Sequence, residues 1–319
     1  MNVLITGITG LLGRAIACRA HEAGYRIFGM SRNPEAPGFD FPVTWITCDL
    51  TNKLESISRS IDVIIHCAAD TTMGAFANEQ QDRVNVGAVQ QLVRAALAAD
   101  IKKFILVSTA KTLKPGTPTQ PGNEASRVPR SSAHLNYINS KIKAEAIVRQ
   151  AVEQDHLDAV IVNPTFIIHP EAGNTSSNRL LNYALKRAIL FYPEGGKNFV
   201  DARDASQAII SAVQNGRKGE NYILSGQQFT YREFYQLAIR ERGSGALLVP
   251  VPAWLLMLSG YFFSWLERLL SHPIGFNVKV ARLLIANNCY TSAKAIDQLG
   301  FKPVPFASTV KQRQEIAGK

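Results

Sequence analysis

Short apolar runs alternate with longer amphipathic stretches through the first half of the 319-residue chain. The apolar runs are too short for helices and predict buried parallel strands; they lie at 3–5, 26–30, 43–47, 62–66, 104–107 and 159–162. Apolar residues recur at helical spacing in 11–23, 78–99 and 137–154. This alternation predicts an α/β fold of the Rossmann type, with a doubly wound parallel sheet.

The regular pattern weakens after Pro164, which marks the expected end of the nucleotide-binding part. Residues 111–130 are rich in Pro, Gly, Thr and Ser and predict a loop. The length of the chain suits one large domain or two unequal ones. The expected division is a nucleotide-binding domain at 1–165, to which 199–227 returns, and a smaller C-terminal substrate lobe at 166–198 and 228–319.

A glycine-rich run follows the first predicted strand and opens the first predicted helix. Gly7 permits a tight turn, Gly10 lets the backbone approach a pyrophosphate, and Gly13 lets the helix pack close to the sheet. The free N–H groups and the positive dipole of the helix N-terminus suit phosphate. The setting predicts a dinucleotide site rather than a tight turn without a ligand. The residues assigned to it are Thr6, Gly7, Thr9, Gly10, Leu11, Leu12 and Gly13.

The end of the second predicted strand distinguishes the two dinucleotides. An acidic side chain there would bind the ribose 2′-OH of NAD, but this chain has Ser31 and Arg32, and no Asp or Glu before Glu35. A cation and a hydroxyl suit a 2′-phosphate, so the sequence favours NADP(H) over NAD. The alternative is an arginine that is merely solvated in a loop.

Two further strand ends contribute to the expected cofactor site. Asp49, followed by Leu50, comes after the third strand and is placed to reach the adenine. Ala68 and Ala69 come after the fourth strand, and their small side chains leave room for the cofactor.

Tyr137 and Lys141 are four residues apart in a predicted helix, so both lie on one face. A lysine beside a phenol favours the phenolate and makes the phenol a better proton donor near neutral pH. Alone, this spacing usually marks a surface pair. Its position after the glycine-rich run makes the pair a candidate catalytic site.

At this point the chain resembles the extended short-chain dehydrogenase/reductase family, within the NAD-dependent epimerase/dehydratase superfamily. The nearest branch is that of dihydroflavonol reductases and 3β-hydroxysteroid dehydrogenases. The most specific match is the Tyr-x-x-Ser-Lys-x-x-Ala-Glu run from Tyr137 to Glu145. The other matching features follow the family's order, at 6–13, 49–50, 66–69, 85–86 and 104–110, with weaker landmarks at 163–165 and 199–208.

The resemblance implies catalytic roles for four residues. Tyr137 would be the general acid/base, and Lys141 would hold the nicotinamide ribose and tune Tyr137. Thr109 would polarise the substrate carbonyl, with Ser108 as the second choice. For both hydroxyls the alternative is a strand end at which they bond the backbone.

Asn85 would support the architecture of the active site, and Pro164 would contact the cofactor, again by resemblance. Two positions depart from the sugar-modifying members of the family. Many of these have an arginine where this chain has Asn163, and many have a Tyr-Gly pair that 111–118 lacks. These departures weaken a nucleotide-sugar function.

Composition and charge limit the partners. The net charge is +10, but Lys and Arg are scattered and not interleaved with aromatics, which argues against nucleic acid. A positive field also suits a polyphosphate cofactor or an anionic membrane surface. The four cysteines and the histidines lack metal-ligand spacing, so no metal site is expected. The first residues lack the features of a signal peptide, which makes the cytoplasm the expected compartment.

The longest uncharged stretch lies at 243–266, and a helix is expected from about Ala253. Its 14 uncharged residues, 253–266, fall short of the about 20 that a membrane span needs. The favoured interpretation is a lid or wall over an apolar substrate. A membrane-surface helix over 253–270, a true span and burial within the core of the lobe are the alternatives.

The sequence therefore favours an NADP(H)-dependent oxidoreductase that interconverts a ketone and a secondary alcohol on a fairly apolar small molecule. One alternative is a nucleotide-sugar epimerase or dehydratase. Another is a non-catalytic NADP(H) sensor or scaffold, against which the intact Tyr137 and Lys141 pair counts. A homodimer is left open. The cations that could bind a second pyrophosphate are Arg179, Lys186, Arg187 and Arg203.

Overall fold

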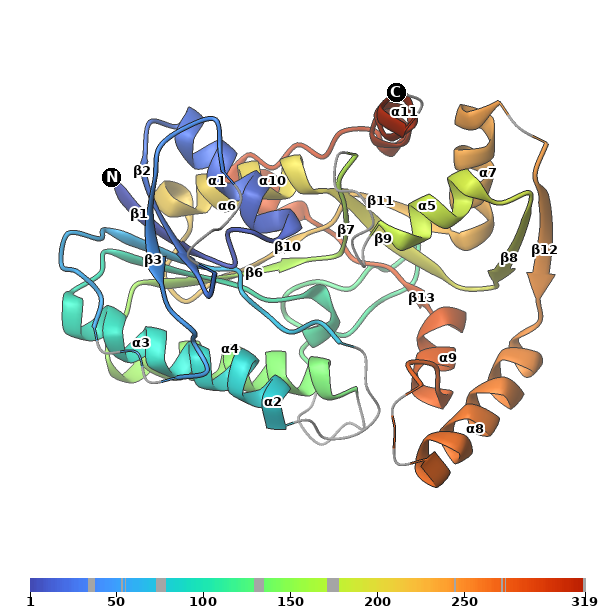
Figure 1. The fold of residues 1–319 in the computed structure, drawn as a ribbon, viewed down its shortest axis with the longest axis horizontal. Coiled ribbons are helices and arrows are strands. Elements are labelled where there is room, and N and C mark those ends of the chain that lie inside the picture. Colours follow the sequence, from blue (N-terminus) through green and yellow to red (C-terminus); the bar gives the residue numbers. More distant parts are fainter. Residues whose placement is uncertain are drawn as a thin grey trace.

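The computed structural model describes residues 1–33, 38–52, 54, 56–72, 79–128, 135–170, 178–243, 245–270, 272 and 274–317. In this part of the chain the largest sheet has seven strands, and every neighbouring pair is parallel (Figure 1). The spatial order is β10 (Asn221–Leu224), β6 (Ala159–Pro164), β5 (Lys103–Val107), β4 (Val63–His66), β1 (Asn2–Thr6), β2 (Arg26–Ser31) and β3 (Val43–Thr47). The predicted doubly wound α/β fold is confirmed.

Helices cover both faces of this sheet, because its strands are apolar on both sides. One face carries α1 (Leu11–Glu22), α6 (Ala202–Asn215) and α10 (Ala293–Leu299) (Figure 1). The other carries α3 (Ala88–Ala99) and α4 (Asn136–Gln154). Alternate residues of each strand enter the two cores, so that Val3 and Ile5 face α1 while Leu4 packs with the helices opposite.

The predicted helix at 78–99 is interrupted. It consists of α2 (Glu79–Asp82), a π-helical turn, η1 (Arg83–Gly87), and α3; Asn78 lies outside the described residues. A π turn inserts an extra residue into the helical register, and such turns often occur at functional sites. Here the turn carries Asn85, which is buried.

The remaining strands lie mostly in a second region, on the right in Figure 1. A four-stranded sheet contains β9 (Gly196–Asp201) between β11 (Gln227–Thr230) and β13 (Asn287–Asn288), and β7 (Phe166–Ile168) also pairs with β9. A separate parallel pair consists of β8 (Ile189–Pro193) and β12 (Leu247–Val251). Three helices, α5 (Arg179–Lys186), α7 (Tyr231–Arg242) and α11 (Phe306–Ala317), pack with these strands around a core of phenylalanines.

The uncharged C-terminal stretch forms α8 (Ala253–Leu270), which begins where the sequence predicts and packs against α9 (Val278–Ile285) (Figure 1). The contact is close at Gly260, where an added Cβ would lie 2.9 Å from the Cα of Val278. Only Gly260 and Glu267 of α8 are buried. No described helix is long and apolar enough to cross a membrane. Because most of α8 is not buried, the predicted burial of this helix in the core of the lobe is wrong.

Candidate active site

A first cavity, of about 970 Å³, opens at the carboxyl ends of β1, β2, β3 and β4. Ligands of open parallel sheets bind at this edge. Among the residues predicted for the cofactor, nine line this cavity: Gly7, Thr9, Gly10, Ser31, Arg32, Asp49, Leu50, Ala68 and Ala69. The sequence did not single out the other half of the lining, namely Met30, Asn33, Cys48, Thr51, Cys67, Asp70, Thr71, Gln80 and Val84.

The glycines of the first turn leave no space for side chains. Gly7 has a φ of +67°, and a Cβ added to it would lie 2.6 Å from the backbone nitrogen of Ala68. A Cβ on Gly13 would lie 2.0 Å from the carbonyl oxygen of Gly7. The turn thus brings bare backbone to the cavity at the N-terminus of α1, an arrangement that fits a dinucleotide pyrophosphate.

Four residues of the predicted glycine-rich run do not line this cavity. Thr6 is fully buried, with its Oγ1 2.7 Å from His66 Nδ1 and 3.3 Å from the backbone nitrogen of Ala68. Thr6 therefore holds the end of β1 against the end of β4. The side chains of Leu11 and Leu12 pack toward the core of the sheet, and Gly13 makes the close contact with Gly7. A role for their backbone in cofactor binding stays a prediction.

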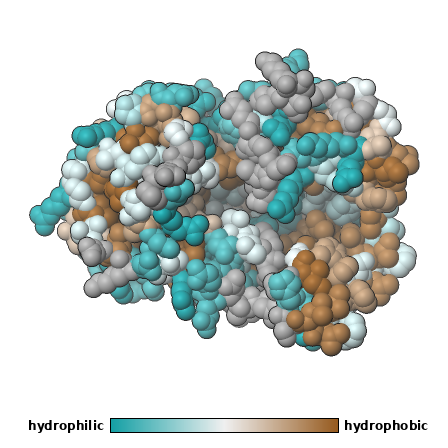
Figure 2. All heavy atoms as spheres, viewed as in Figure 1, coloured by the Kyte–Doolittle hydropathy of each residue, from teal (hydrophilic) through white to brown (hydrophobic). Residues whose placement is uncertain are grey.

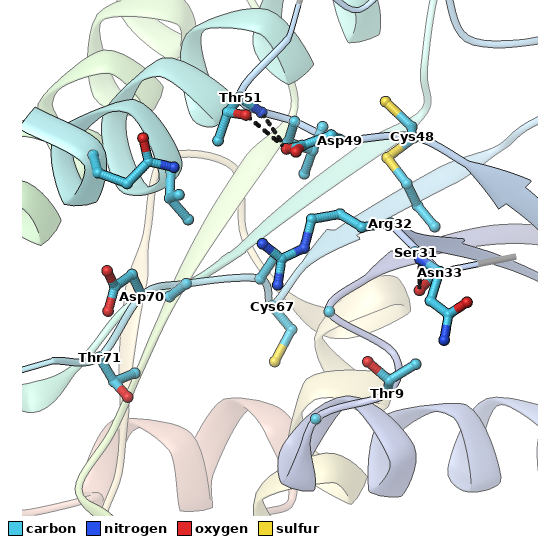
Figure 3. Close-up of a pocket in the computed structure, with 18 residues that line it drawn as sticks. Thr9, Ser31, Arg32, Asn33, Cys48, Asp49, Thr51, Cys67, Asp70 and Thr71 are labelled. Atoms are coloured by element: carbon cyan, nitrogen blue, oxygen red, sulfur yellow. Dashed lines mark hydrogen bonds between the residues drawn. The ribbon is translucent and has the colours of Figure 1, made fainter. Parts of the chain in front are cut away.

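Arg32 is exposed and extends from the end of β2 across the cavity, as Figure 3 shows. It has no ion pair or hydrogen bond within the described part of the chain. Nearby, the Asp49 Oδ1 accepts hydrogen bonds from the backbone nitrogen of Thr51, at 2.9 Å, and from the Thr51 hydroxyl, at 2.8 Å. These bonds lower the pKa of Asp49, which stays a carboxylate.

A second cavity, of about 390 Å³, adjoins the first, since Thr71 lines both. Its predicted members are Ser108, Thr109, Tyr137 and Pro164. Most of its remaining wall is apolar, from Ala110, Leu135, Phe166, Ile167, Val280, Leu283 and Leu284. The structure thus brings the predicted catalytic hydroxyls to an apolar cavity beside the predicted cofactor site.

Tyr137 is 8% exposed, and its hydroxyl interacts with the side chain of Thr109. Burial raises the pKa of the Tyr137 phenol to about 12, and the interaction with Thr109 offsets only part of that effect. The sequence predicted a phenol activated toward phenolate. The opposite shift prevails here because burial of the ring penalises the charged form.

Lys141 is 2% exposed, one turn from Tyr137 on α4, and its Nζ donates to the carbonyl oxygen of Val107 at 2.9 Å. Burial lowers the pKa of this ammonium to about 8. Lys141 lines neither cavity, and its Nζ is held at the end of β5 by the Val107 carbonyl oxygen.

Asn85 links the loop after β4 to α4. Its Nδ2 donates to Ser140 Oγ and to the carbonyl oxygen of Asp70, both at 2.9 Å, and its Oδ1 accepts from the Asp70 backbone nitrogen at 2.8 Å. Ser140 in turn donates to the carbonyl oxygen of Tyr137. Asn85 therefore fixes the start of α4 relative to a loop that lines the first cavity.

Glu145, to which the sequence assigned no role, is a buried carboxylate next to Ser108. Glu145 Oε1 has three partners within 2.6–2.8 Å, namely Ser108 Oγ, Thr112 Oγ1 and Asn163 Nδ2. Its Oε2 pairs with Arg149 at 3.1 Å. Because Ser108 donates to Glu145, Thr109 is the hydroxyl that faces Tyr137. Asn163 is part of this cluster. The sequence identified it only as a position where many sugar-modifying members of the family have an arginine.

The C-terminal part of the second cavity comes from α9 rather than α8, through Val280, Leu283 and Leu284. No residue of α8 is among the described residues that line it. The prediction that 253–270 forms a lid or wall over the substrate is therefore wrong. Its sequence gives an apolar helix, but the fold places α9 between that helix and the cavity.

None of the cations proposed for a second pyrophosphate reaches this cavity among its described lining residues. Arg203, for example, pairs with Asp201 at 2.6 Å and bonds Gln312. The remaining three are Arg179, Lys186 and Arg187, on α5 and just beyond it.

Known proteins share this architecture. Residues 3–225 match the NAD dependent epimerase/dehydratase family. A putative dihydroflavonol 4-reductase of Synechocystis is 25% identical, over 97% of this chain and 91% of that protein. The 3beta-hydroxysteroid-dehydrogenase/decarboxylase isoform 1 of Arabidopsis thaliana is 24% identical, over 85% of this chain and 66% of that protein.

A solved structure shows the same fold across the whole chain. It is a UDP-glucose 4-epimerase of Thermotoga maritima with UDP-glucose, which aligns with a TM-score of 0.76 and 15% identity and covers 100% of this chain and 99% of its own. The family match spans well over half of the sequence and includes β1 to β10. The chain therefore belongs to the NAD dependent epimerase/dehydratase family, among the extended short-chain dehydrogenases/reductases that its motifs indicated.

Proposed function

We propose that this protein is an NADP(H)-dependent oxidoreductase that interconverts a ketone and a secondary alcohol on a fairly apolar small molecule. One observation carries the proposal: Tyr137 and Thr109 both line a mainly apolar cavity that adjoins the first cavity at Thr71. A carbonyl oxygen placed at these hydroxyls would have two donors, one of which can release its proton.

The chain's own groups divide the work of the reaction. The bound NADPH supplies the hydride. Thr109 orients and polarises the carbonyl oxygen, and Tyr137 gives its proton to the alkoxide. The raised pKa of Tyr137, about 12, keeps the phenol protonated at neutral pH, which is the form that reduction requires. Lys141 would hold the nicotinamide ribose, as the resemblance implies.

Cofactor choice rests on the end of β2. Arg32 and Ser31 line the first cavity, and no carboxylate of the described β2 end competes for the ribose. An arginine without an ion pair or hydrogen bond within the described residues suits a phosphate, so NADP(H) is the proposed cofactor and NAD the less favoured one.

The substrate class follows from the walls of the second cavity. They are mainly apolar, and the charged residues among those described there are Lys111 and Lys197. An apolar wall suits an apolar skeleton. The names of the two relatives, a putative dihydroflavonol reductase and a hydroxysteroid dehydrogenase, also favour an apolar skeleton over a nucleotide sugar.

A spectrophotometric assay of NADPH consumption tests this function. We expect net oxidation of NADPH with flavanonol, ketosteroid or aryl ketone probes, and one alcohol formed per NADPH consumed. Conversion of UDP-glucose without a net change in NADPH, together with no reduction of any ketone, would replace the proposal with the epimerase alternative. Cofactor binding without turnover of either class would support the sensor alternative.

We also propose that α8 makes a peripheral contact with a membrane surface. Its outward stripe is more than half exposed and consists of Trp254, Leu258, Tyr261, Phe262, Trp265 and Leu269. These residues recur at helical spacing on the side away from α9, where Figure 2 shows apolar surface at the lower right. Trp and Tyr favour the membrane interface, and the net charge of +10 favours anionic lipid.

Vesicle co-sedimentation tests this contact. We expect binding to vesicles of phosphatidylcholine with phosphatidylglycerol, weakened about 10-fold by the double change Leu258→Ser and Trp265→Ser. Ile296→Ser, at an apolar residue of α10 that is 51% exposed, is the control and should bind normally. If the unmodified protein does not bind vesicles but forms a dimer, and the double variant is monomeric, a second copy of the chain covers α8 instead.

A further inference from the structure

Two lysines stand in the wall of the second cavity, and they come from distant parts of the chain. Lys111 lies in the turn η2 (Ala110–Thr112), two residues after Thr109. Lys197 lies in β9. The rest of the described lining is apolar or uncharged, with no Asp, Glu, Arg or His. The fold therefore brings two cations, and no described anion, to the cavity that holds Tyr137.

Neither lysine has an acidic partner in the described chain. No ion pair or hydrogen bond of either Nζ occurs there. The Nζ of Lys197 lies instead over two aromatic rings, 4.5 Å from the centroid of Phe166 and 5.3 Å from that of Tyr231. An aromatic face stabilises a cation modestly, but it does not neutralise the charge.

The surroundings of both ammonium groups are unfavourable for charge. Burial lowers the pKa of Lys111 to about 8. Burial and the charge of Lys111 together lower the pKa of Lys197 to about 7. Both lysines are only partly exposed. A charge held against an apolar wall without a partner is costly, and a purely structural role would be served better by an apolar side chain of similar length. A ligand that carries the missing negative charge removes this cost.

We propose that the second cavity binds a substrate that has an anionic group, a carboxylate or a phosphate ester, held between Lys111 and Lys197 while its carbonyl lies at Tyr137 and Thr109. This inference rests on the proposed function, because it names the substrate class of the same site. The apolar residues of β7 and α9 bind the skeleton. The substrate is then amphipathic, with a ketone and an acid on one small apolar framework.

Matched probes separate the anionic group from the rest of the ligand. The probes are 4-oxo-4-phenylbutanoate, its methyl ester and the corresponding keto phosphonate, titrated calorimetrically into the protein saturated with NADP⁺. We expect the free acid to bind about 10-fold or more tightly than the ester, because charge-assisted bonds are stronger than neutral ones. A phosphonate that binds more tightly still would indicate a phosphate ester, and one that binds more weakly a carboxylate.

Variants assign the preference to the two lysines. In Lys111→Met/Lys197→Met the ratio of acid to ester affinity should fall to about one. Lys114→Met is the matched control, because Lys114 is exposed three residues beyond Lys111 and lines neither cavity; it should keep the ratio. The affinity of each variant for NADP⁺ reports whether it is folded, and the single lysine variants serve if the double one is not.

The outcomes distinguish this inference from the proposed reaction. Equal binding of acid and ester by the unmodified protein would overturn it, and so would an acid preference that survives in the double variant. Acid-selective binding without reduction of any ketone would support the anion site and contradict the proposed reaction. Reduction of ketones without any acid preference would support the reaction and contradict the anion site.

Discussion

The two cavities of this protein are built in different ways. The first is polar, and most of its residues come from 7–10, 30–33, 48–51 and 67–71, each at the carboxyl end of a strand of the parallel sheet or directly after it. The second is mainly apolar and is assembled from η2, α4, β7, β9 and α9, which are far apart in the sequence. The first cavity follows from the sheet itself, because the carboxyl ends of parallel strands meet at one edge. The second cavity depends on how elements from later in the chain pack against one another.

The difference separates positions that the backbone geometry fixes from positions that it leaves open. Backbone at the first turn is fixed by Gly7 and Gly13, whose positions exclude any side chain. No comparable backbone constraint fixes Lys111 or Lys197. Their neighbours in the second cavity are mainly apolar, and no Asp or Glu is among the described residues that line it. We therefore expect changes in the first cavity to affect the cofactor and changes in the second to affect the substrate.

The largest effect should come from Tyr137→Phe, which keeps the ring and removes the transferable proton. Turnover of any ketone that the protein reduces should fall by about 100- to 10,000-fold. NADPH affinity, measured by calorimetry, should stay nearly unchanged, because Tyr137 lines the second cavity only. Tyr25→Phe, whose hydroxyl bonds Gln214 away from both cavities, is the control. Near-normal activity of Tyr137→Phe would rule out the mechanism.

Gly13→Ala should be the most disruptive change at the first cavity. The new Cβ would lie 2.0 Å from the Gly7 carbonyl oxygen, so α1 or the turn must move. We expect unfolding free energy to fall by about 3 kcal/mol and NADPH binding to weaken with it. Gly87→Ala is the matched control, since nothing lies within 4 Å of its Cβ. Urea denaturation of both variants is the measurement, and equal stabilities would show that the turn tolerates a side chain.

The sequence predicted the first cavity better than the second, for physical reasons. Turn glycines and residues at strand ends are local signals, and they predict half of the residues that line the first cavity. The helix that lines the second cavity could not be chosen in this way, because apolar periodicity identifies α8 and α9 as apolar without saying which one lies beside Tyr137. Glu145 was part of the recognised motif, but its bonds to Ser108, Thr112 and Asn163 depend on the approach of three separate elements.

Arg32→Ala should weaken NADPH selectively, by about 10-fold, because an exposed guanidinium gives up part of its hydrogen-bond energy to solvent. NADH affinity should change little, since NADH has no 2′-phosphate. Arg26→Ala, at the opposite end of β2, serves as the control variant. Calorimetric titration in which the unmodified protein binds NADH as tightly as NADPH would contradict the assignment of Ser31 and Arg32.

The smallest expected effect is a several-fold change with pH in the ratio of keto acid to keto ester affinity at the second cavity. The ratio of keto acid to keto ester affinity should fall as pH rises through about 7 to 8, because Lys197 and Lys111 then lose the charges that hold the anion. The other titratable groups that face the lysines are the phenols of Tyr137, Tyr231 and Tyr290. Burial raises the pKa of each, so all three stay neutral throughout this range.

The buried Lys141 also titrates near pH 8, but it lines neither cavity, so it should affect acid and ester alike and cancel in their ratio. Calorimetric titrations from about pH 6 to about pH 9, at constant ionic strength, measure the ratio directly. The same series on Lys111→Met/Lys197→Met should give a flat ratio near one. A ratio that is independent of pH in the unmodified protein would mean that the lysines do not hold the acid. The charges in the second cavity would then need an explanation other than the substrate.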